Sequence, residues 1–323
     1  MYVLEFAGED DPFAAAEARA AASGVSILAP GLGTADAVDL ERVRGLAYTR
    51  RASELVAQAA ADVETVVAVL EGASIERSGT VAVRARDVRG TADIDTQAAE
   101  RELGRVLVDR GFDVDLSNPD HTLVALFADS SAVLGWQLAT STREYGDRAP
   151  TERPFFQPGS MDPLLARAVG NLARIEPGDL VLDPMCGTGG LLIEAGLLGG
   201  RPIGIDAQEK MVKGTRENLQ EVLGESPLVA RGDGTRLPLP ADSVDAVVFD
   251  VPYGRQSKIE THGLADLVEG ALFEARRVSP RAVVVADRSY EVLAREAGWT
   301  VTETHERRVH RSLTRHVHVL TPD

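Results

Sequence analysis

Residues 180–190 read LVLDPMCGTGG, in which a short apolar run ends at Asp183 and passes into a glycine-rich turn. A buried strand, such a turn and then an apolar helix over residues 191–198 are typical of an open α/β sheet that binds its ligand beyond the strand ends. The glycines let a ligand approach the backbone closely. The turn lacks the GxGxxG and GK[ST] spacings of phosphate-binding loops, and the Asp183 carboxylate would repel a phosphate. It therefore favours a cationic ligand that carries an amino group and a sulfonium.

Two more acidic residues follow apolar runs further along the chain, each at the expected end of a strand. Asp206 stands in GID, about 20 residues past the turn, where an acid can accept hydrogen bonds from both hydroxyls of a ribose. Asp233 stands in RGDG and could accept a hydrogen bond from an adenine amine. Asp206 could also cap the helix that follows it, and Asp233 could belong to a surface turn.

Another acidic residue, Asp250, begins the sequence DVPY at residues 250–253 and decides the chemistry. An exocyclic amine of a nucleobase is a poor nucleophile because its lone pair is delocalised into the ring. Two acceptors can draw its hydrogens out of the ring plane, and the Asp250 carboxylate and the Val251 carbonyl are adjacent acceptors. Pro252 stiffens the turn, and Tyr253 offers a face on which an extracted base can stack. The alternative is a plain proline-containing turn at a strand end.

A family resemblance rests on four motifs, DPMCGTGG, GID, GDG and DVPY. Together they resemble the class I, Rossmann-like methyltransferases, in the amine-methylating subgroup marked by [DN]-P-P-[YF]. The chain departs from that pattern at Val251, which keeps the backbone carbonyl but makes the turn less rigid than proline would. The resemblance implies an α/β fold class and S-adenosyl-L-methionine (S-adenosylmethionine) as the cofactor.

The resemblance extends over nearly the whole chain. The segment 67–138, with VRARDVRG and VLVDRGFDVDLSNPD, looks like a THUMP domain, an RNA-binding module, and RPFFQPGSMDPLLARAVGNLA looks like the entry to the methyltransferase domain. With GIDAQEKMVKGTRENL and DVPYGRQS, the chain is similar to the archaeal tRNA guanine-N2 methyltransferases that modify position 10. That family forms N2-methylguanosine and then N2,N2-dimethylguanosine, so tRNA is the implied substrate. Two alternatives stay open: a guanine elsewhere in tRNA or in rRNA, and a catalytically inactive RNA-binding module.

The implied site residues divide into a cofactor group and a catalytic group. S-adenosylmethionine would be held by Asp183, Pro184, Cys186, Gly187, Thr188, Gly189, Gly190, Asp206, Asp233 and Gly234. The methyl transfer would be carried by Asp250, Val251, Pro252 and Tyr253. Cys186 is the only cysteine, and no activating histidine lies near it in sequence, so we interpret it as a small packing residue. We expect no metal, because a multi-cysteine site is excluded and no acid or cysteine pattern completes a site with the tail histidines.

We expect an N-terminal α+β, ferredoxin-like domain over residues 1–64, a THUMP domain over 65–140, a linker over 141–160 and a Rossmann-like methyltransferase domain over 161–323. Before the linker, the patterns predict strands at 2–6, 25–29, 80–86, 123–128 and 132–138 and helices at 13–23, 40–60 and 97–110. After it, they predict helices at 162–173, 191–198, 211–223 and 264–278, strands at 180–182, 202–205, 228–231, 244–249 and 282–286, and a hairpin that pairs 301–304 with 317–320.

The chain is acidic, with a net charge of −16 over 323 residues. Its 34 basic residues include three lysines, Lys210, Lys213 and Lys258. This composition predicts a protein of a halophilic archaeon that works in high salt, where self-repulsion is screened; an ordinary acidic cytosolic protein is the alternative. The acidic N-terminal residues are unlike a secretory signal, and no apolar run approaches the ~18 residues of a membrane span. We therefore expect a cytoplasmic protein.

Clusters of basic residues are rare in so acidic a chain and are the candidate RNA contacts. They are Arg84, Arg86 and Arg89 in the THUMP segment, Arg148 and Arg153 in the linker, and Arg307, Arg308 and Arg311 in the tail, where Arg315 follows. A solvated linker and a solvated basic hairpin are the alternatives. The partners that the resemblance implies are tRNA and, for some related enzymes, a small zinc-binding activator protein; neither DNA nor a membrane is expected.

Overall fold

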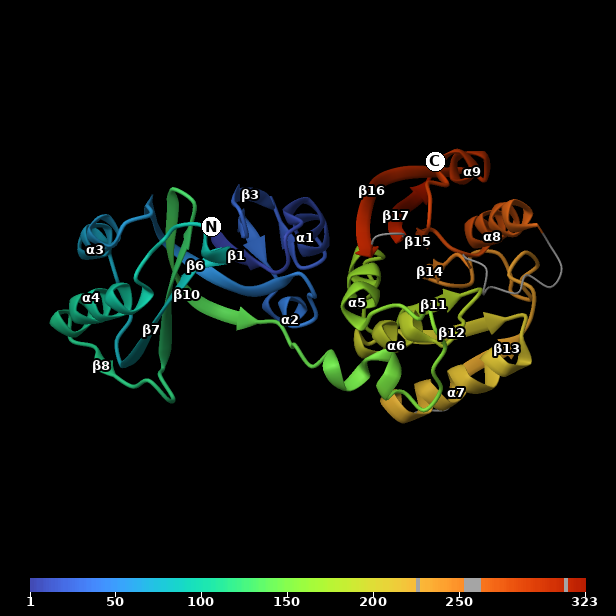
Figure 1. Ribbon diagram of the computed structural model, residues 1–323, viewed down its shortest axis with the longest axis horizontal. Helices are drawn as coiled ribbons and strands as arrows, with labels where there is room; N and C mark the ends of the chain where they lie inside the picture. The colour runs from blue at the N-terminus through green and yellow to red at the C-terminus, as the bar shows by residue number, and fades with distance from the viewer. Residues whose placement is uncertain (225–226, 253–262, 311–312) are drawn as a thin grey trace. The chain divides into compact units, whose positions relative to one another are not determined.

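The computed structural model describes residues 1–224, 227–252, 263–310 and 313–323. The chain divides into two compact units, Met1–Arg143 and Glu144–Asp323 (Figure 1). Tyr253, expected in the catalytic group, and Arg311, expected to contact RNA, lie outside the described residues. None of the helices in the described ranges is long and apolar enough to cross a membrane.

The first unit is built on one eight-stranded sheet. Its strands run in the order β3 (Ser26–Ala29), β4 (Leu32–Ala35), β1 (Tyr2–Phe6), β6 (Thr49–Ala60), β10 (Ser131–Thr140), β9 (His121–Ala128), β7 (Thr80–Asp87) and β8 (Asp113–Val114). A two-stranded ribbon pairs β2 (Ala22–Ser23) with β5 (Ala37–Val38). The helices are α1 (Asp11–Ala18), α2 (Leu40–Val43), α3 (Val63–Gly72) and α4 (Thr96–Asp109). Because β6 pairs with both β1 and β10, the segments 1–64 and 65–140 contribute to one sheet.

The expected helix over residues 40–60 is wrong. The helix α2 ends at Val43, and the later residues form β6. Leu46 and Ala47, which fitted a helical spacing, are buried in the connection between α2 and β6. The stretch ASELVAQAA favours a helix locally, but backbone pairing on both edges of β6 overrides that propensity.

Strand β9 shows that this sheet has an apolar core on both faces. Its odd-numbered residues from Leu123 to Phe127 join the cluster formed with α3 and α4, which lie together in Figure 1. Its even-numbered residues from Val124 to Ala128 join the cluster on the opposite face. A strand that is apolar at successive positions is therefore buried from both sides.

The second unit carries a seven-stranded sheet in the part of the chain that the structure describes. The order is β13 (Leu228–Arg231), β12 (Arg201–Asp206), β11 (Leu180–Asp183), β14 (Ala246–Asp250), β15 (Ala282–Ala286), β17 (Leu313–Pro322) and β16 (Trp299–His310). The first five strands are parallel, and the last two form an antiparallel hairpin. The helices are α5 (Pro163–Leu172), α6 (Gly190–Leu197), α7 (Glu209–Leu223), α8 (Leu264–Val278) and α9 (Glu291–Glu296). The expected alternation of helices with parallel strands, and with it the Rossmann-like α/β fold class, is confirmed.

The strand order reverses direction between β11 and β14. From β11 the chain moves outward through β12 to β13 and then places β14 on the other side of β11. In open α/β sheets, ligands bind beyond the carboxyl ends of the strands at such a switch point. Asp183 ends β11 and Asp250 ends β14, so two of the predicted site residues stand at this point.

Most of the segment expected as a linker packs on the second unit. Arg148 Nε donates to Glu194 Oε1 at 2.9 Å, and Arg167 Nη2 lies 2.8 Å from Glu194 Oε2. A Cβ at Gly214 of α7 would overlap the Phe155 ring. Glu194 is fully buried in the apolar helix GLLIEAGL, so one internal carboxylate ties the start of this segment to α5 and α6.

Glu194→Gln should lower the free energy of unfolding by about 3 kcal/mol, because it leaves one buried and one partly buried guanidinium group without their counter-charge. The matched control is Glu209→Gln on α7, which removes a 3.8 Å ion pair between Lys213 and a side chain that is 52% exposed. That change should cost less than about 0.5 kcal/mol. Urea titration followed by circular dichroism measures both values. Equal costs would mean that Glu194 does not hold the segment in place.

Candidate active site

Carboxylates gather at one edge of the second sheet. Strands β11, β12 and β14 end at Asp183, Asp206 and Asp250, and because these strands are parallel neighbours the side chains lie at the same edge. Burial raises the pKa of the Asp183 carboxyl well above its usual range, and the carboxylates of Asp206 and Asp250 raise it further. Charged carboxylates crowded in a buried site favour a cationic ligand.

The glycine-rich turn after β11 is shaped by α7. Gly187 and Gly189 have φ angles of 53° and 78°, in the left-handed region that glycine adopts without strain. Thr215 Oγ1 donates to the Gly187 carbonyl at 2.6 Å. A Cβ at Gly189 would lie 2.8 Å from the Thr215 side chain. Backbone conformation therefore favours glycine at both positions, and close packing against Thr215 also requires it at Gly189.

Asp206 fastens this turn to the end of the next strand. Its Oδ2 accepts from the Gly187 N–H at 2.9 Å, and its Oδ1 accepts from the Gln208 N–H at 2.9 Å. Gln208 precedes α7 as its cap residue, so the helix-cap alternative for Asp206 is wrong. A carboxylate can accept about four hydrogen bonds, so these two bonds are compatible with a further bond from a ribose hydroxyl.

Thr188 and Gly190 are covered by the segment that precedes α5. Ser160 Oγ lies 3.0 Å from Thr188 Oγ1, and Asn218 Nδ2 donates to the Thr188 carbonyl at 2.9 Å. A Cβ at Gly190 would lie 3.0 Å from Arg153 Nη1. Contacts from α7 and from the segment before α5 thus fix the turn before any ligand arrives.

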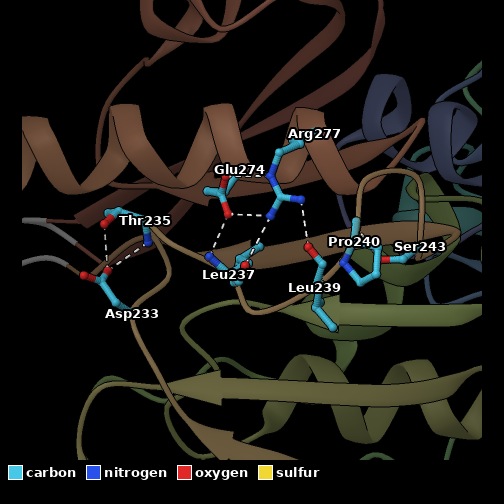
Figure 2. A network of polar contacts seen from close by, with 8 residues as sticks. All are labelled: Asp233, Thr235, Leu237, Leu239, Pro240, Ser243, Glu274 and Arg277. Atoms are coloured by element: carbon cyan, nitrogen blue, oxygen red, sulfur yellow. Dashed lines mark hydrogen bonds and ion pairs between the residues drawn. The ribbon is translucent and has the colours of Figure 1, made fainter.

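Asp233 and Gly234 lie in the loop after β13, and Figure 2 shows Asp233 beside Thr235. Asp233 Oδ1 accepts from the Thr235 N–H at 2.9 Å and from Thr235 Oγ1 at 2.8 Å. A Cβ at Gly234 would lie 2.8 Å from the Pro184 carbonyl, so this loop packs on the turn after β11. Asp233 therefore closes a turn, which was its alternative role in the sequence analysis. That turn lies next to the glycine-rich turn after β11.

Helix α8 holds the rest of that loop (Figure 2). Glu274 Oε2 accepts from the Leu237 N–H at 2.6 Å, and Arg277 Nη1 donates to the Leu239 carbonyl at 2.7 Å. Arg277 Nη2 also pairs with Glu274 Oε2 at 2.7 Å, and this hydrogen bond lowers the pKa of the Glu274 carboxyl. The position of the Asp233 loop therefore depends on residues outside the recognised motifs.

Asp250 and Val251 stand where β14 passes into the DVPY motif. The Val251 side chain is fully buried, and its N–H donates to the Val285 carbonyl at 2.8 Å, which extends the pairing with β15. The Asp250 side chain is 22% exposed, and its Oδ2 lies 3.4 Å from Arg315 Nη2 of β17. Pro252 follows as a half-buried residue. The motif thus presents a partly exposed carboxylate at the end of a strand that is paired with β15.

Cys186 is buried in the cluster that contains Leu192 and Val229. Burial raises the pKa of its thiol well above the usual value, so the reactive thiolate is disfavoured. A Cβ at Gly204 would lie 3.1 Å from the sulfur, which therefore fills the space against β12. This environment suits a packing residue.

Several of the arginines expected to contact RNA do not fit that role. Arg148 is paired with Glu194, and Arg153 is only 6% exposed, with its Nε bonded to the Arg148 carbonyl at 3.0 Å. In the tail, Arg308 is exposed on β16 and Arg307 is half-buried beside it. Both of these side chains remain candidates, whereas Arg148 and Arg153 stabilise the fold of the second unit.

In the first unit, several arginines lie around one buried acid, Glu5. Glu5 has a side chain that is 1% exposed, and it lies 2.6 Å from Arg51 Nε, 2.9 Å from Arg86 Nη1 and 3.9 Å from Arg50 Nε. A cavity of about 420 Å³ is lined in part by Arg51, Arg84 and Arg86. Burial, and after it the neighbouring Arg86, lowers the pKa of the Arg50 guanidinium. This excess of positive charge around one carboxylate suits an anionic ligand.

Arg89 does not join that group. Its guanidinium pairs with Asp11, and its side chain is 22% exposed. Asp11 also accepts from the Gly31 N–H at 3.1 Å, so Arg89 supports the connection around α1 and β4. Sequence reasoning missed Glu5 and Glu194 as organising residues, although a single acid inside an apolar strand, YVLEF, or an apolar helix, GLLIEAGL, is a readable signal.

Comparisons with known proteins agree with this fold. Residues 150–317 match the family of the RMKL-like methyltransferase domain. The tRNA (guanine(10)-N2)-dimethyltransferase of Methanothermobacter thermautotrophicus is 37% identical over 285 residues, which span 85% of this chain and 83% of that protein. The enzyme of the same name from Methanocaldococcus jannaschii is 34% identical over 78% of this chain and 74% of its own. The crystal structure of TrmN from Thermus thermophilus, at 24% identity, covers 100% of this chain and 99% of its own with a TM-score of 0.51, which shows the same fold.

Asp183→Asn should raise the thermal stability of the protein at neutral pH, because it removes a carboxylate whose ionisation is opposed by burial. The folded carboxyl titrates above its unfolded value of about 3.9, so ionisation costs stability as the pH rises past that value. The advantage of the variant should vanish at about pH 3 and grow toward neutral pH. Thermal melts across this range measure it.

Asp120→Asn provides a control of opposite sign. Hydrogen bonds from the Thr80 N–H and hydroxyl lower the pKa of the Asp120 carboxyl, so its removal should reduce stability at neutral pH. Calorimetry should also show weaker binding of S-adenosylmethionine to Asp183→Asn. If Asp183→Asn were less stable than the wild type at neutral pH, the interpretation of Asp183 as an acid whose ionisation destabilises the fold would be contradicted.

Proposed function

Since the chain belongs to the tRNA guanine-N2-methyltransferase family, we propose that it methylates the guanine at position 10 of tRNA, first once and then twice. The family reaction transfers the methyl group of S-adenosylmethionine to the N2 amine of a guanine. This proposal rests mainly on one observation. Asp250 and Val251 lie at the same sheet edge as Asp183 and Asp206.

The residues at this edge fit S-adenosylmethionine, which supplies a methyl group activated on a sulfonium. Asp183, buried and close to other carboxylates, would accept hydrogen bonds from the ammonium group of the cofactor. Asp206 would accept from the ribose, and Asp233 from the adenine amine. Gly187 and Gly189 allow the cofactor to approach the backbone. The positive charge of the cofactor would then offset the carboxylates that crowd this edge.

The catalytic proposal concerns the N2 amine of guanine. Asp250 Oδ and the Val251 carbonyl would accept its two hydrogens and so turn the lone pair toward the methyl group. Asp250 would also accept the proton that the amine loses on methylation. These two acceptors are fixed by the pairing of β14 with β15, so the reaction would gain chiefly from orientation and from preorganised charge.

Asp250→Asn should reduce the methyl-transfer rate by about 100- to 1,000-fold while the affinity for S-adenosylmethionine changes little, because an amide is a weaker acceptor and a poor base. The assay uses labelled cofactor and unmodified tRNA transcripts, followed by nucleoside mass spectrometry and mapping of the modified position. It should be run in dilute buffer and in molar KCl, since the net charge of −16 favours folding in high salt.

The control for that assay is Glu296→Gln, an exposed acid on α9 that should leave the rate unchanged. Near-full turnover by Asp250→Asn would exclude the catalytic role of this carboxylate. Methylation at another guanine would keep the chemistry and discard position 10. Cofactor binding without transfer to any RNA would support the alternative of an inactive RNA-binding module.

The first unit is proposed to bind the tRNA backbone, as a THUMP-containing region. The support is the cavity lined in part by Arg51, Arg84 and Arg86, two of which, Arg51 and Arg86, pair with the buried Glu5. Arg84 is exposed on β7, where its guanidinium donates to the Leu116 carbonyl at 2.7 Å. Guanidinium groups that are held in place lose little conformational entropy when they bind a phosphate.

Arg84→Gln should weaken tRNA binding and lower the slope of log K against log salt by about one unit, as expected for one lost phosphate contact. The rate at saturating tRNA should not change, because Arg84 lies in the first unit and not at the methyl-transfer site. Filter binding at several salt concentrations measures the slope. The control is Arg105→Gln on α4, whose side chain is 68% exposed. Equal effects of the two variants would exclude a specific contact at Arg84.

A small activator protein remains part of this proposal. In the described sheet, β13 is an outer strand, and its Leu228 is 60% exposed. An outer strand with an apolar residue can pair with a strand of a partner. Transfer by the purified chain alone would argue against a required activator, whereas transfer that appears only after addition of cell extract would support one.

A further inference from the structure

Arg315 brings a buried cation to the catalytic carboxylate from the far side of the sheet. It lies near the start of β17, and the next residue, His316, pairs with Ala286 at the end of β15. Its side chain is 5% exposed, and its Nη2 lies 3.4 Å from Asp250 Oδ2 and 3.3 Å from the Gly159 carbonyl. The antiparallel strand β17 therefore delivers a guanidinium to the edge at which the parallel strands end.

The order of polar atoms on guanine limits how Asp250 can meet the N2 amine. The N2 amine lies between the N1–H group, a donor, and N3, an acceptor. A carboxylate beside N3 would face its lone pair and be repelled, whereas beside N1 it can accept from N1–H and N2–H together. Asp250 is therefore expected on the N1 side, with the Val251 carbonyl left to accept the other N2 hydrogen.

Beyond N1 on the same edge of guanine stands O6, an acceptor. A group that lies next to the Asp250 carboxylate on this side must be a donor to match it. Arg315 is such a group, because a guanidinium has five N–H donors in a planar fork and can hold a carboxylate while it addresses a second acceptor. Its contact with Asp250 Oδ2 sets the two groups side by side, in the order that the guanine edge requires.

We propose that Arg315 donates a hydrogen bond to O6 of the target guanine and so selects guanine over other bases that carry a 2-amino group. The proposal rests on the proposed function, in which Asp250 accepts from the N2 amine. The sequence placed Arg315 beside the basic tail residues that were candidates for RNA contact. A buried side chain at this edge would instead contact the base and not the RNA backbone.

The test compares two substrates for each enzyme variant. One is the tRNA transcript with its natural target guanosine, and the other carries 2-aminopurine there, which keeps the 2-amino group and lacks O6 and N1–H. The wild type should prefer guanine in kcat/KM by about 10- to 100-fold, as expected when a built donor loses its acceptor. Arg315→Met should lower this ratio by about tenfold, because the variant has no donor for O6 to satisfy. The preference that remains comes from the N1–H group, which Asp250 accepts and 2-aminopurine lacks.

The ratio separates base reading from a positioning role. If Arg315 only holds Asp250 in place, Arg315→Met will slow both substrates by the same factor and the ratio will stay at the wild-type value, which would overturn the proposal. Arg315→Lys is the second variant; it keeps the charge but loses the planar fork, and it should retain part of the preference. An unchanged ratio in both variants would likewise overturn it.

The control variant is Arg295→Met, which removes an arginine that is 58% exposed on α9 and should keep both rates and their ratio. The assay also distinguishes failure of the proposed function from failure of the role of Arg315 alone. A wild-type protein that methylates no guanine of tRNA overturns the proposed function and the role of Arg315 with it. A wild type that methylates guanine, beside an Arg315→Met variant with the same ratio, overturns the role of Arg315 alone.

Discussion

The hydrogen bond from the Gly187 N–H to Asp206 Oδ2, 2.9 Å long, joins the ends of β11 and β12 and fixes the shape of the glycine-rich turn after β11. Thr215 holds the same glycine from α7 through its carbonyl. Gly189 can then take its left-handed conformation and start α6. The site depends on this bond because the backbone that would meet the cofactor is set by a carboxylate that also stands at the proposed ribose position.

Acids that are buried or largely buried hold several arginines of this acidic chain in place. Glu5 gathers arginines in the first unit, Glu194 holds two in the second, and Asp250 contacts Arg315 at the sheet edge. Each case sets a cation in a defined place at the cost of burying charge, which is tolerated only with close pairing. A composition rich in arginine, whose planar fork pairs well with carboxylates, makes such arrangements possible. Net charge alone therefore says little about where an anionic substrate can bind.

Most elements of the second unit could be predicted from local sequence patterns. The strand, turn and helix around Asp183, and the acids at the ends of β12 and β14, depend on residues close together in sequence, and their placement at one edge follows from the parallel topology. Strand β6 was missed because its composition favours a helix, and only pairing with β1 and β10 decides otherwise. Arg148 and Arg153 were misread because exposure depends on Glu194 and the packing of the preceding segment, which no local pattern records.

The sequence by itself determined the α/β class, the methyltransferase family and the acids at the strand ends that we propose to face the cofactor, since motif, spacing and strand ends carry that information locally. Only the tertiary structure decided which arginines are accessible and which are internal. It also decided that β17, running antiparallel at the far side of β15, brings Arg315 within 3.4 Å of Asp250. These two side chains are 65 positions apart in the chain. The sequence gives no signal of their contact, because it is produced by strand order in the sheet and by the reach of one long side chain.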